Sequence, residues 1–189
     1  MLTVDAARLQ REMNTLAGFT HVEQTGREGD VAVTRVVFTE DDLAARAWLK
    51  SLYEEAGLHV REDAVGNTFA RWLGKEPNLP AVGTGSHTDA IPHAGMYDGT
   101  LGVLGGLEAI RTLQRAGVQP TRSIELLMFT SEEPTRFGIG CLGSRLLAGT
   151  LDPARADALL GKDDLALQQV RGTAGFTGDL AAVKLPAGY

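Results

Sequence analysis

Three stretches of the chain repeat apolar residues every three or four positions, which is the spacing of amphipathic helices. The first covers residues 2–16 and is followed by Gly18. The second follows Thr39, a good N-cap residue, and ends before Gly57, a residue type common just after a helix. The third covers residues 99–117. Within the second helix the pattern predicts a buried stripe of Leu43, Ala47, Leu49, Leu52 and Tyr53.

Short runs of β-branched and other apolar residues predict strands between these helices. The runs are residues 31–38, 58–63, 67–74, 81–87 and 123–130. The second and third runs meet at a Gly-Asn pair and predict a hairpin. Because strands alternate with helices, we predict an α/β fold, a three-layer αβα sandwich with a mostly parallel central sheet.

The remaining segments carry weaker signals. Residues 26–30 form a predicted polar turn, and residues 144–149 predict the start of a short helix. Residues 171–189 are rich in glycine and weakly patterned, so no element is assigned to them. The length of 189 residues suits one ordinary domain.

The composition narrows the class of protein. The apolar fraction of 43% and the charged fraction of 22% are typical of a soluble globular chain. The net charge of −6 and the lack of a long lysine or arginine run argue against nucleic-acid binding. No apolar stretch approaches the roughly 18 residues of a membrane span, and a lone cysteine, Cys141, fits a reducing compartment. We therefore expect a cytoplasmic protein that binds neither nucleic acid nor membranes.

Side chains that can bind a metal or transfer a proton lie at the ends of two of the predicted strands. In the stretch GSHTDAIPHAGMYDG, His87 and Asp89 are two residues apart and point to the same side of an extended strand. Asp98 precedes the third helix, and Glu132 and Glu133 follow the last strand. The carboxyl ends of parallel strands share one edge of a sheet, so we expect these side chains to gather there. One imidazole with several carboxylates suits zinc or manganese better than magnesium.

Each of these motifs also has an ordinary structural explanation. An isolated H-x-D occurs by chance, an Asp-Gly pair commonly forms a turn, and a Glu-Glu pair is commonly a solvated surface. Glu132 and Glu133 point in different directions on an extended backbone, which allows one to bind metal and the other to transfer protons. The joint position of the motifs after strands favours the metal site. His93 is expected on a turn outside that site, and Cys141 is interpreted as structural.

The chain resembles the M20 family of metal-dependent amidohydrolases and peptidases in two segments, GSHTDAIPHAGMYDGTLGVLGGLEAI and FTSEEPTRFGIGCLGSR, which match its H-x-D, D-G and E-E motifs. Residues 33–72 are similar to a narrower branch of the family. That branch acts on ureido and carbamoyl compounds such as ureidoglycolate, allantoate and N-carbamoyl amino acids. The resemblance spans residues 14–150 and implies a catalytic domain with the αβα fold.

The resemblance implies a site for two divalent metal ions, with manganese favoured and zinc as the alternative. His87 is implied to bind one metal, Glu133 to bind the other, and Asp98 to bridge the two. Glu132 is implied to be the general base, and Asp89 to support His87 as a catalytic residue.

The implied reaction is hydrolysis of a ureido or carbamoyl C–N bond in a small-molecule ureide. A water that bridges the metals is implied to give its proton to Glu132 and to attack the carbamoyl carbon. The resemblance also implies a cis peptide bond between Asp98 and Gly99, and a full-length homodimer.

The chain departs from the family pattern in its ligands. Members have two further ligand histidines and a lid domain that dimerises, and no histidine of this chain matches either position. We therefore expect residues 1–189 to be the N-terminal part of the catalytic domain, without the rest of that domain and without the lid. Such a chain is expected to bind metal weakly and to be weakly active alone. Two alternatives stay open, namely an M20 peptidase or deacylase and a non-catalytic domain.

Overall fold

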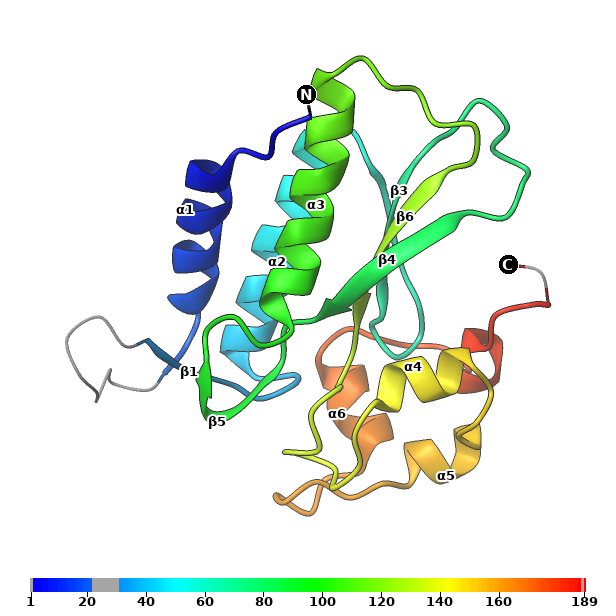
Figure 1. The fold of residues 1–189 in the computed structure, drawn as a ribbon. Helices are drawn as coiled ribbons and strands as arrows, with labels where there is room; N and C mark the ends of the chain where they lie inside the picture. The colour runs from blue at the N-terminus through cyan, green and yellow to red at the C-terminus, as the bar shows by residue number, and fades with distance from the viewer. Residues whose placement is uncertain (1, 22–30, 188) are drawn as a thin grey trace.

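The structure, a computed structural model, is built around a four-stranded sheet and describes residues 2–21, 31–187 and 189 (Figure 1). In the order β2-β3-β6-β4, the strands are His59–Glu62, Thr68–Trp72, Ile124–Phe129 and Val82–His87. β4 runs parallel to β6, whereas β6 with β3 and β3 with β2 are antiparallel. The predicted α/β class and the predicted hairpin are confirmed. The mostly parallel sheet is supported only in part, because β4 with β6 is parallel while the other two strand pairs of this sheet are antiparallel.

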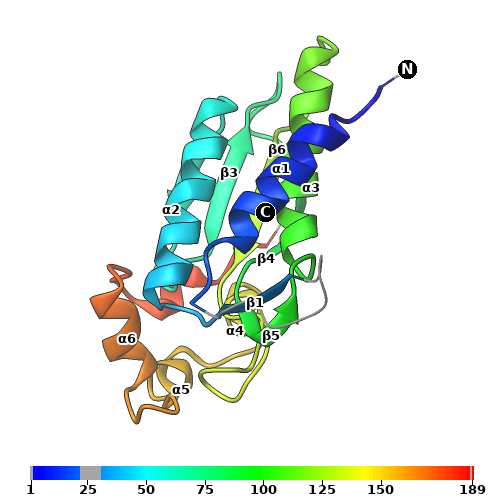
Figure 2. The same cartoon turned by 90° about the vertical axis from the view of Figure 1, so that its left-hand side faces the viewer.

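Three long helices lie on one side of the sheet, with α2 and α3 against the strands and α1 packed on α3 (Figures 1 and 2). They are α1, Ala6–Ala17, α2, Glu40–Glu55, and α3, Thr100–Arg115. Asp5 and Thr39 cap the first two, since each side chain accepts a hydrogen bond from a first-turn amide. The fully buried side chains of this core include Met13, Leu16, Leu49, Tyr53, Leu104, Leu107, Ile110, Leu126 and Met128.

The buried face of α2 differs from the predicted stripe. Ala47 is exposed and Leu43 is half-buried, whereas Asp42 and Arg46 are buried beside Leu49. Arg46 Nε donates to Asp42 Oδ2 at 2.9 Å, so an ion pair on successive turns takes the place of apolar contact. Ion pairing allows charged side chains to be buried. The periodicity of hydrophobic residues does not reveal such side chains.

Short helical segments pack near the carboxyl ends of β4 and β6 (Figure 1). They are α4, Leu142–Leu147, α5, Pro153–Asp157, α6, Leu167–Thr173, and the 3-10 helix η1, Leu180–Val183. Their apolar side chains form a second core with Phe69 of β3. The segment that the sequence left unassigned supplies Leu180 and Val183 to this core.

A two-stranded antiparallel ribbon lies beside the main sheet. It consists of β1, Ala32–Arg35, and β5, Ala90–Gly95. β1 is shorter than the predicted strand because the backbone turns at Phe38, whose φ is 62°. The turn expected at His93 is wrong, since His93 lies in β5 and its N–H donates to Thr34 Oγ1 at 2.9 Å.

Two further expectations concern the chain as a whole. Within the described ranges, no helix combines the length and the apolar character that crossing a membrane requires. The polar turn predicted at residues 26–30 lies outside the described residues.

A buried carboxylate joins α1 to α3. Glu108 Oε2 accepts hydrogen bonds from Arg8 Nε at 2.9 Å and Nη2 at 2.6 Å. Its Oε1 accepts from the Asp5 amide at 2.9 Å and from Arg115 Nη2 at 3.0 Å. Burial by itself raises the pKa of Glu108, but these hydrogen bonds outweigh it and hold the pKa at about 2.

The Glu108→Gln variant is expected to lose about 2 kcal/mol of unfolding free energy at neutral pH, because an amide oxygen forms weaker hydrogen bonds than a carboxylate. The folded pKa lies below the ordinary value of 4.5, so the carboxylate stabilises the fold fully above that pH. This contribution is lost as the pH falls from 4.5 toward about 2. Urea unfolding from neutral pH to about pH 3 measures both effects.

Glu76→Gln is the matched control, because Glu76 is an exposed glutamate in the loop between β3 and β4. Equal stability of the two variants at neutral pH would contradict the prediction. So would a Glu108→Gln variant that keeps the full acid dependence of the wild type.

Candidate active site

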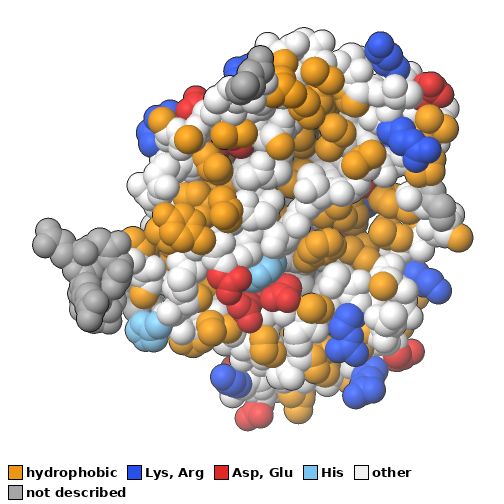
Figure 3. Space-filling view, in the orientation of Figure 1, with side chains coloured by type: hydrophobic (Ala, Val, Ile, Leu, Met, Phe, Trp, Pro, Cys, Tyr) orange, Lys and Arg blue, Asp and Glu red, His pale blue; other side chains and the backbone are white. Residues whose placement is uncertain are grey.

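The side chains selected from the sequence meet at the carboxyl ends of β4 and β6. His87 is the last residue of β4, and Glu132 and Glu133 follow the end of β6. Asp98 lies two residues before the first residue of α3. Figure 3 shows a histidine at the molecular surface with acidic side chains gathered around it.

His87 presents one ring nitrogen to the carboxylates. Its Nδ1 lies 2.9 Å from the backbone carbonyl oxygen of Asp89. A carbonyl only accepts hydrogen bonds, so Nδ1 carries the proton and Nε2 keeps its lone pair in the neutral ring. Nε2 lies 3.5 Å from Glu132 Oε2 and 4.0 Å from Asp98 Oδ1. His87 is 7% exposed, and both carboxylates lie on the Nε2 side of its ring.

Asp89 links the end of β4 to the loop after β6. Its Oδ1 accepts a hydrogen bond from the Glu132 amide at 3.2 Å, and its Oδ2 accepts one from the Glu133 amide at 3.0 Å. Burial raises the pKa of Asp89 to about 6, although the hydrogen bond from Glu133 lowers it. The carboxylate lies 3.7 Å from His87 Nδ1, so the direct hydrogen bond to the ring comes from the backbone of residue 89 instead.

Cys141 contacts the carboxylate of Glu132, which the sequence reasoning missed. Cys141 Sγ donates to Glu132 Oε1 at 3.3 Å, and its backbone amide donates to the Glu132 carbonyl at 2.7 Å. The hydrogen bond to Glu132 raises the pKa of the thiol. Nine positions separate the two residues, and no local periodicity signals such a contact.

The donor set has the chemistry of a divalent cation site. Burial raises the pKa of Glu133, and the neighbouring carboxylates of Glu132 and Asp98 raise it further, while His87 lowers it. A bound cation relieves this mutual repulsion. Among the described residues, however, no group of three His, Cys, Asp or Glu side chains is close enough to hold a metal ion. The residues present fit a metal by their chemistry and require additional or repositioned ligands to enclose it.

Gly99 keeps the imidazole accessible. Its φ is 65°, and a Cβ at this position would lie 2.6 Å from His87 Cδ2. The peptide bond between Asp98 and Gly99 was expected to be cis, and this is wrong, because no described residue forms a cis peptide bond. The chain turns instead through the positive φ of Gly99, which glycine adopts without strain.

An α/β sheet that carries an imidazole and several carboxylates beyond its parallel strands is an arrangement that suits a metal-dependent hydrolase. The family model of Peptidase family M28 matches residues 67–167, more than half of the chain. The chain therefore belongs to this family, which is related to M20.

Individual relatives indicate which branch of the family the chain resembles. The chain is 56% identical over 155 residues to ureidoglycolate hydrolase of Arabidopsis thaliana, which covers 82% of this chain and 31% of the relative. It is 37% identical over 164 residues to an N-carbamoyl-L-amino-acid amidohydrolase of Paenarthrobacter aurescens, which covers 87% of this chain and 38% of the relative. The crystal structure of AtUAH in complex with glyoxylate matches with a TM-score of 0.91 and 48% identity, over 99% of this chain and 44% of that chain.

These matches confirm the resemblance to the ureido and carbamoyl branch. The chain spans about a third of the length of these two curated relatives, 31% of one and 38% of the other.

The Gly99→Ala variant is expected to lose more stability than a positive φ alone explains. A non-glycine residue at positive φ costs roughly 1 kcal/mol, and the new Cβ must also displace the His87 ring. Gly117→Ala is the control, because Gly117 has φ 70° and a Cβ added there would meet no atom within 4 Å. Urea unfolding and the NMR signals of the His87 ring measure the two effects. Equal losses with unmoved ring signals in both variants would refute the role of Gly99.

Proposed function

We propose that the chain is the N-terminal part of the catalytic domain of a metal-dependent amidohydrolase. The proposed substrate is ureidoglycolate or a related ureido or carbamoyl compound, and the bond that is cleaved is its ureido C–N bond. The observation that carries the proposal is the position of His87 Nε2, which faces Glu132 and Asp98 where two parallel strands end. The 56% identity to ureidoglycolate hydrolase supports the choice of substrate class.

In this proposal His87, Asp98 and Glu133 hold two divalent ions, with manganese favoured and zinc as the alternative. Imidazole and carboxylate ligands suit both metals. When bound, the ions supply Lewis acidity at the ureido carbonyl. The relatives, of which the chain spans 31% and 38%, have further sequence. We assign the remaining ligands, a lid and the contacts of a homodimer to that further sequence.

Glu132 is the proposed general base. Its Oε2 faces the His87 ring, while its Oε1 is held by the thiol of Cys141. This orientation leaves one carboxylate oxygen free to take a proton from the attacking water and to return it to the leaving nitrogen. The C–N bond then breaks, and the carbamate product decomposes to ammonia and carbon dioxide.

Asp89 is the proposed positioning residue for both glutamates. Its carboxylate fixes the two amides, so the side chains of Glu132 and Glu133 leave the backbone in set directions. The carbonyl of the same residue selects the tautomer of His87.

A second candidate function is hydrolysis of a dipeptide or an acylated amino acid. The match to Peptidase family M28 favours it. The two candidates share the metal site and differ in the bond that is presented to Glu132, so a substrate comparison separates them.

The first test is turnover with Mn²⁺ on ureidoglycolate, allantoate, an N-carbamoyl amino acid and a dipeptide. We expect slow ammonia release from a ureido compound, and a loss of at least about 100-fold in the Glu132→Gln variant, because the general base is removed. Glu76→Gln is the exposed control and should keep the wild-type rate. Cleavage of the dipeptide alone would establish the peptidase alternative. If no substrate shows turnover that depends on Glu132, the non-catalytic alternative is the correct one.

The second test measures Mn²⁺ binding by electron paramagnetic resonance without any substrate. Wild-type protein is expected to bind Mn²⁺ weakly and saturably, because the described residues provide an incomplete ligand set. Glu133→Gln should weaken the affinity by at least about tenfold, while Glu132→Gln should bind nearly as well as wild type. Equal affinity in the wild type and Glu133→Gln would contradict the assignment of Glu133 as a ligand.

A further inference from the structure

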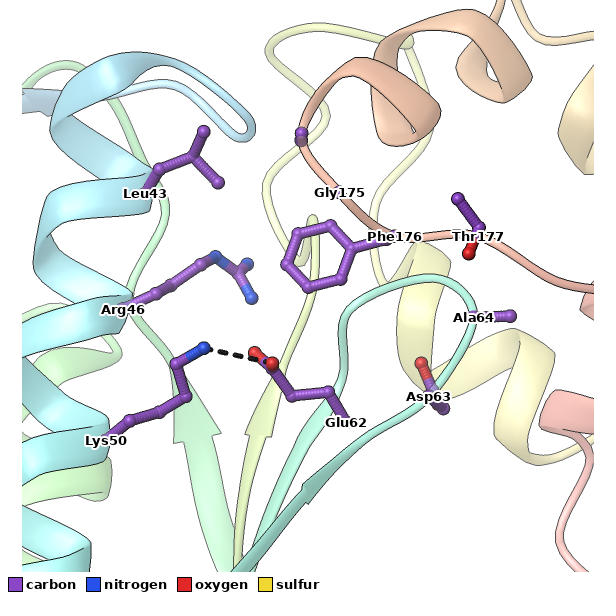
Figure 4. A pocket seen from close by; sticks show the side chains of 10 residues that line it. Leu43, Arg46, Lys50, Glu62, Asp63, Ala64, Gly175, Phe176 and Thr177 are labelled. Carbon is purple, nitrogen blue, oxygen red and sulfur yellow. Dashed lines mark hydrogen bonds and ion pairs between the residues drawn. The ribbon is translucent and has the colours of Figure 1, made fainter.

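A pocket that the candidate active-site residues do not line lies between α2, the end of β2 and the loop after α6 (Figure 4). Its volume is about 460 Å³. None of the residues that line it belongs to the proposed catalytic set. Three of its side chains, Arg46, Lys50 and Phe176, determine which ligand it suits.

Arg46 leaves one nitrogen of its buried guanidinium without a partner. Nε donates to Asp42 Oδ2 at 2.9 Å, and Nη1 donates to the Gly66 carbonyl at 2.9 Å and to Thr130 Oγ1 at 3.3 Å. Nη2 is buried and has no hydrogen-bond partner among the described residues, and the whole side chain is only 2% exposed. A buried cationic donor without an acceptor is unfavourable, and Oδ1 of its ion-pair partner Asp42 is likewise buried without a partner among the described residues. An acceptor placed at Nη2 would remove the part of this cost that falls on the guanidinium.

Phe176 forms a fixed aromatic wall beside this guanidinium. The ring centroid lies 6.0 Å from Arg46 Cζ and 5.8 Å from the centroid of Phe38. Gly66 also packs closely against the Phe176 ring, because a Cβ on that glycine would lie 3.2 Å from ring carbons. Figure 4 shows the guanidinium and the ring side by side on the pocket wall.

A second cation lies near the mouth of the pocket. Lys50 Nζ contacts Glu62 Oε2 at 3.0 Å, which uses one of its three donors. Asp63, the other carboxylate of the pocket, already accepts hydrogen bonds from the Val65 and Asn67 amides and from the Asn67 side chain. Arg46 Nη2 and the remaining donors of Lys50 can therefore take an acceptor from a ligand, while the two nearby carboxylates disfavour a ligand with several negative charges.

We propose that this pocket binds a small monocarboxylate. One carboxylate oxygen accepts from Arg46 Nη2, the other accepts from a free donor of Lys50, and the short apolar part of the ligand lies against the Phe176 ring. Binding of the monocarboxylate does not require the proposed hydrolytic activity.

The position of Thr130 gives the site a physical connection to the catalytic loop. Thr130 Oγ1 accepts from Arg46, its amide donates to Asn67 Oδ1 at 2.9 Å, and Glu132 follows two residues later. A ligand that accepts a hydrogen bond from Arg46 Nη2 changes the hydrogen bonding of the same guanidinium that donates to Thr130. The Thr130 amide therefore responds to binding, although the ligand does not touch it.

The test is a ¹⁵N NMR titration of the 189-residue chain with propionate. We expect saturable shifts of the Arg46 Nε signal and of the amides of Phe176 and Thr130. Lys50→Met should weaken the affinity about tenfold, the effect of one charge-assisted hydrogen bond. Lys75→Met, an exposed lysine outside the pocket, should leave the affinity unchanged. Arg46→Lys removes Nη2 and should abolish binding while the rest of the amide spectrum stays folded.

Propionamide and inorganic phosphate complete the design. Propionamide has the same shape without the charge, and phosphate carries more charge without the apolar part. Both are expected to bind more weakly than propionate. Lack of a saturable shift with propionate overturns the site, and equal or tighter binding of propionamide or phosphate overturns the ligand class. Should Arg46→Lys unfold, the comparison of Lys50→Met with Lys75→Met still decides the outcome.

Discussion

The candidate site depends on one interaction, the acceptance of hydrogen bonds from two successive backbone amides by the buried carboxylate of Asp89. β4 and β6 are adjacent parallel strands, so their carboxyl ends already lie close together. Adjacency alone does not fix the loop that follows β6. The two hydrogen bonds fix it, because they bind the peptide units from which both Glu132 and Glu133 project. His87 is set by the backbone carbonyl of the same residue, so one position orients the imidazole and both carboxylates.

A buried arginine holds the backbone beside this aspartate. Arg35 is fully buried, and its guanidinium donates to the carbonyls of Leu16, Phe19 and Thr88. Burial lowers the pKa of Arg35 to about 10, against the raising effect of nearby carboxylates, so the group stays charged at neutral pH. The end of α1 and strand β1 are thereby connected to the turn between His87 and Asp89. The fold supports the site from a distant segment of the chain, because Arg35 donates to Thr88 across 53 positions.

The sequence predicted the helix ends and turns that depend on residues close together in the chain. The cap at Thr39, the glycine at position 57 and the hairpin between β2 and β3 are present as expected. Each depends on residues within a few positions of one another. Strand β5 was not predicted because its sequence, AIPHAG, contains proline and glycine, and because only pairing with the distant β1 stabilises it.

The residues that the sequence proposed for the site lie near one another in the structure, because their motifs coincide with strand ends. The sequence could not predict how their polar atoms are paired. The buried charges of Arg35, Arg46 and Glu108 look like surface residues in a hydrophobicity pattern. Their burial depends on partners in other elements, as does the contact between Cys141 and Glu132. Tertiary hydrogen bonding of this kind has no periodicity along the chain.

The loop between β6 and α4 carries features that do not favour stability. Ser131 and Cys141 have positive φ values of 52° and 57° without being glycine. The hydroxyls of Ser131 and Thr135 are buried and have no hydrogen-bond partner among the described residues. Together with the repulsion that raises the pKa of Glu133, these features place strain, unmet polar groups and like charges in one short segment.

Such a concentration is expected where the fold serves a site instead of its own stability. The two apolar cores and the buried ion pairs supply the stability, and Phe137 of the loop belongs to the second core. Hydrogen bonds from the loop's amides to the side chains of Asp89 and Asn67 then hold it in its unfavourable conformation. The geometry of Glu132 and Glu133 is therefore imposed on this loop by its surroundings, and not by the conformational preferences of its own residues.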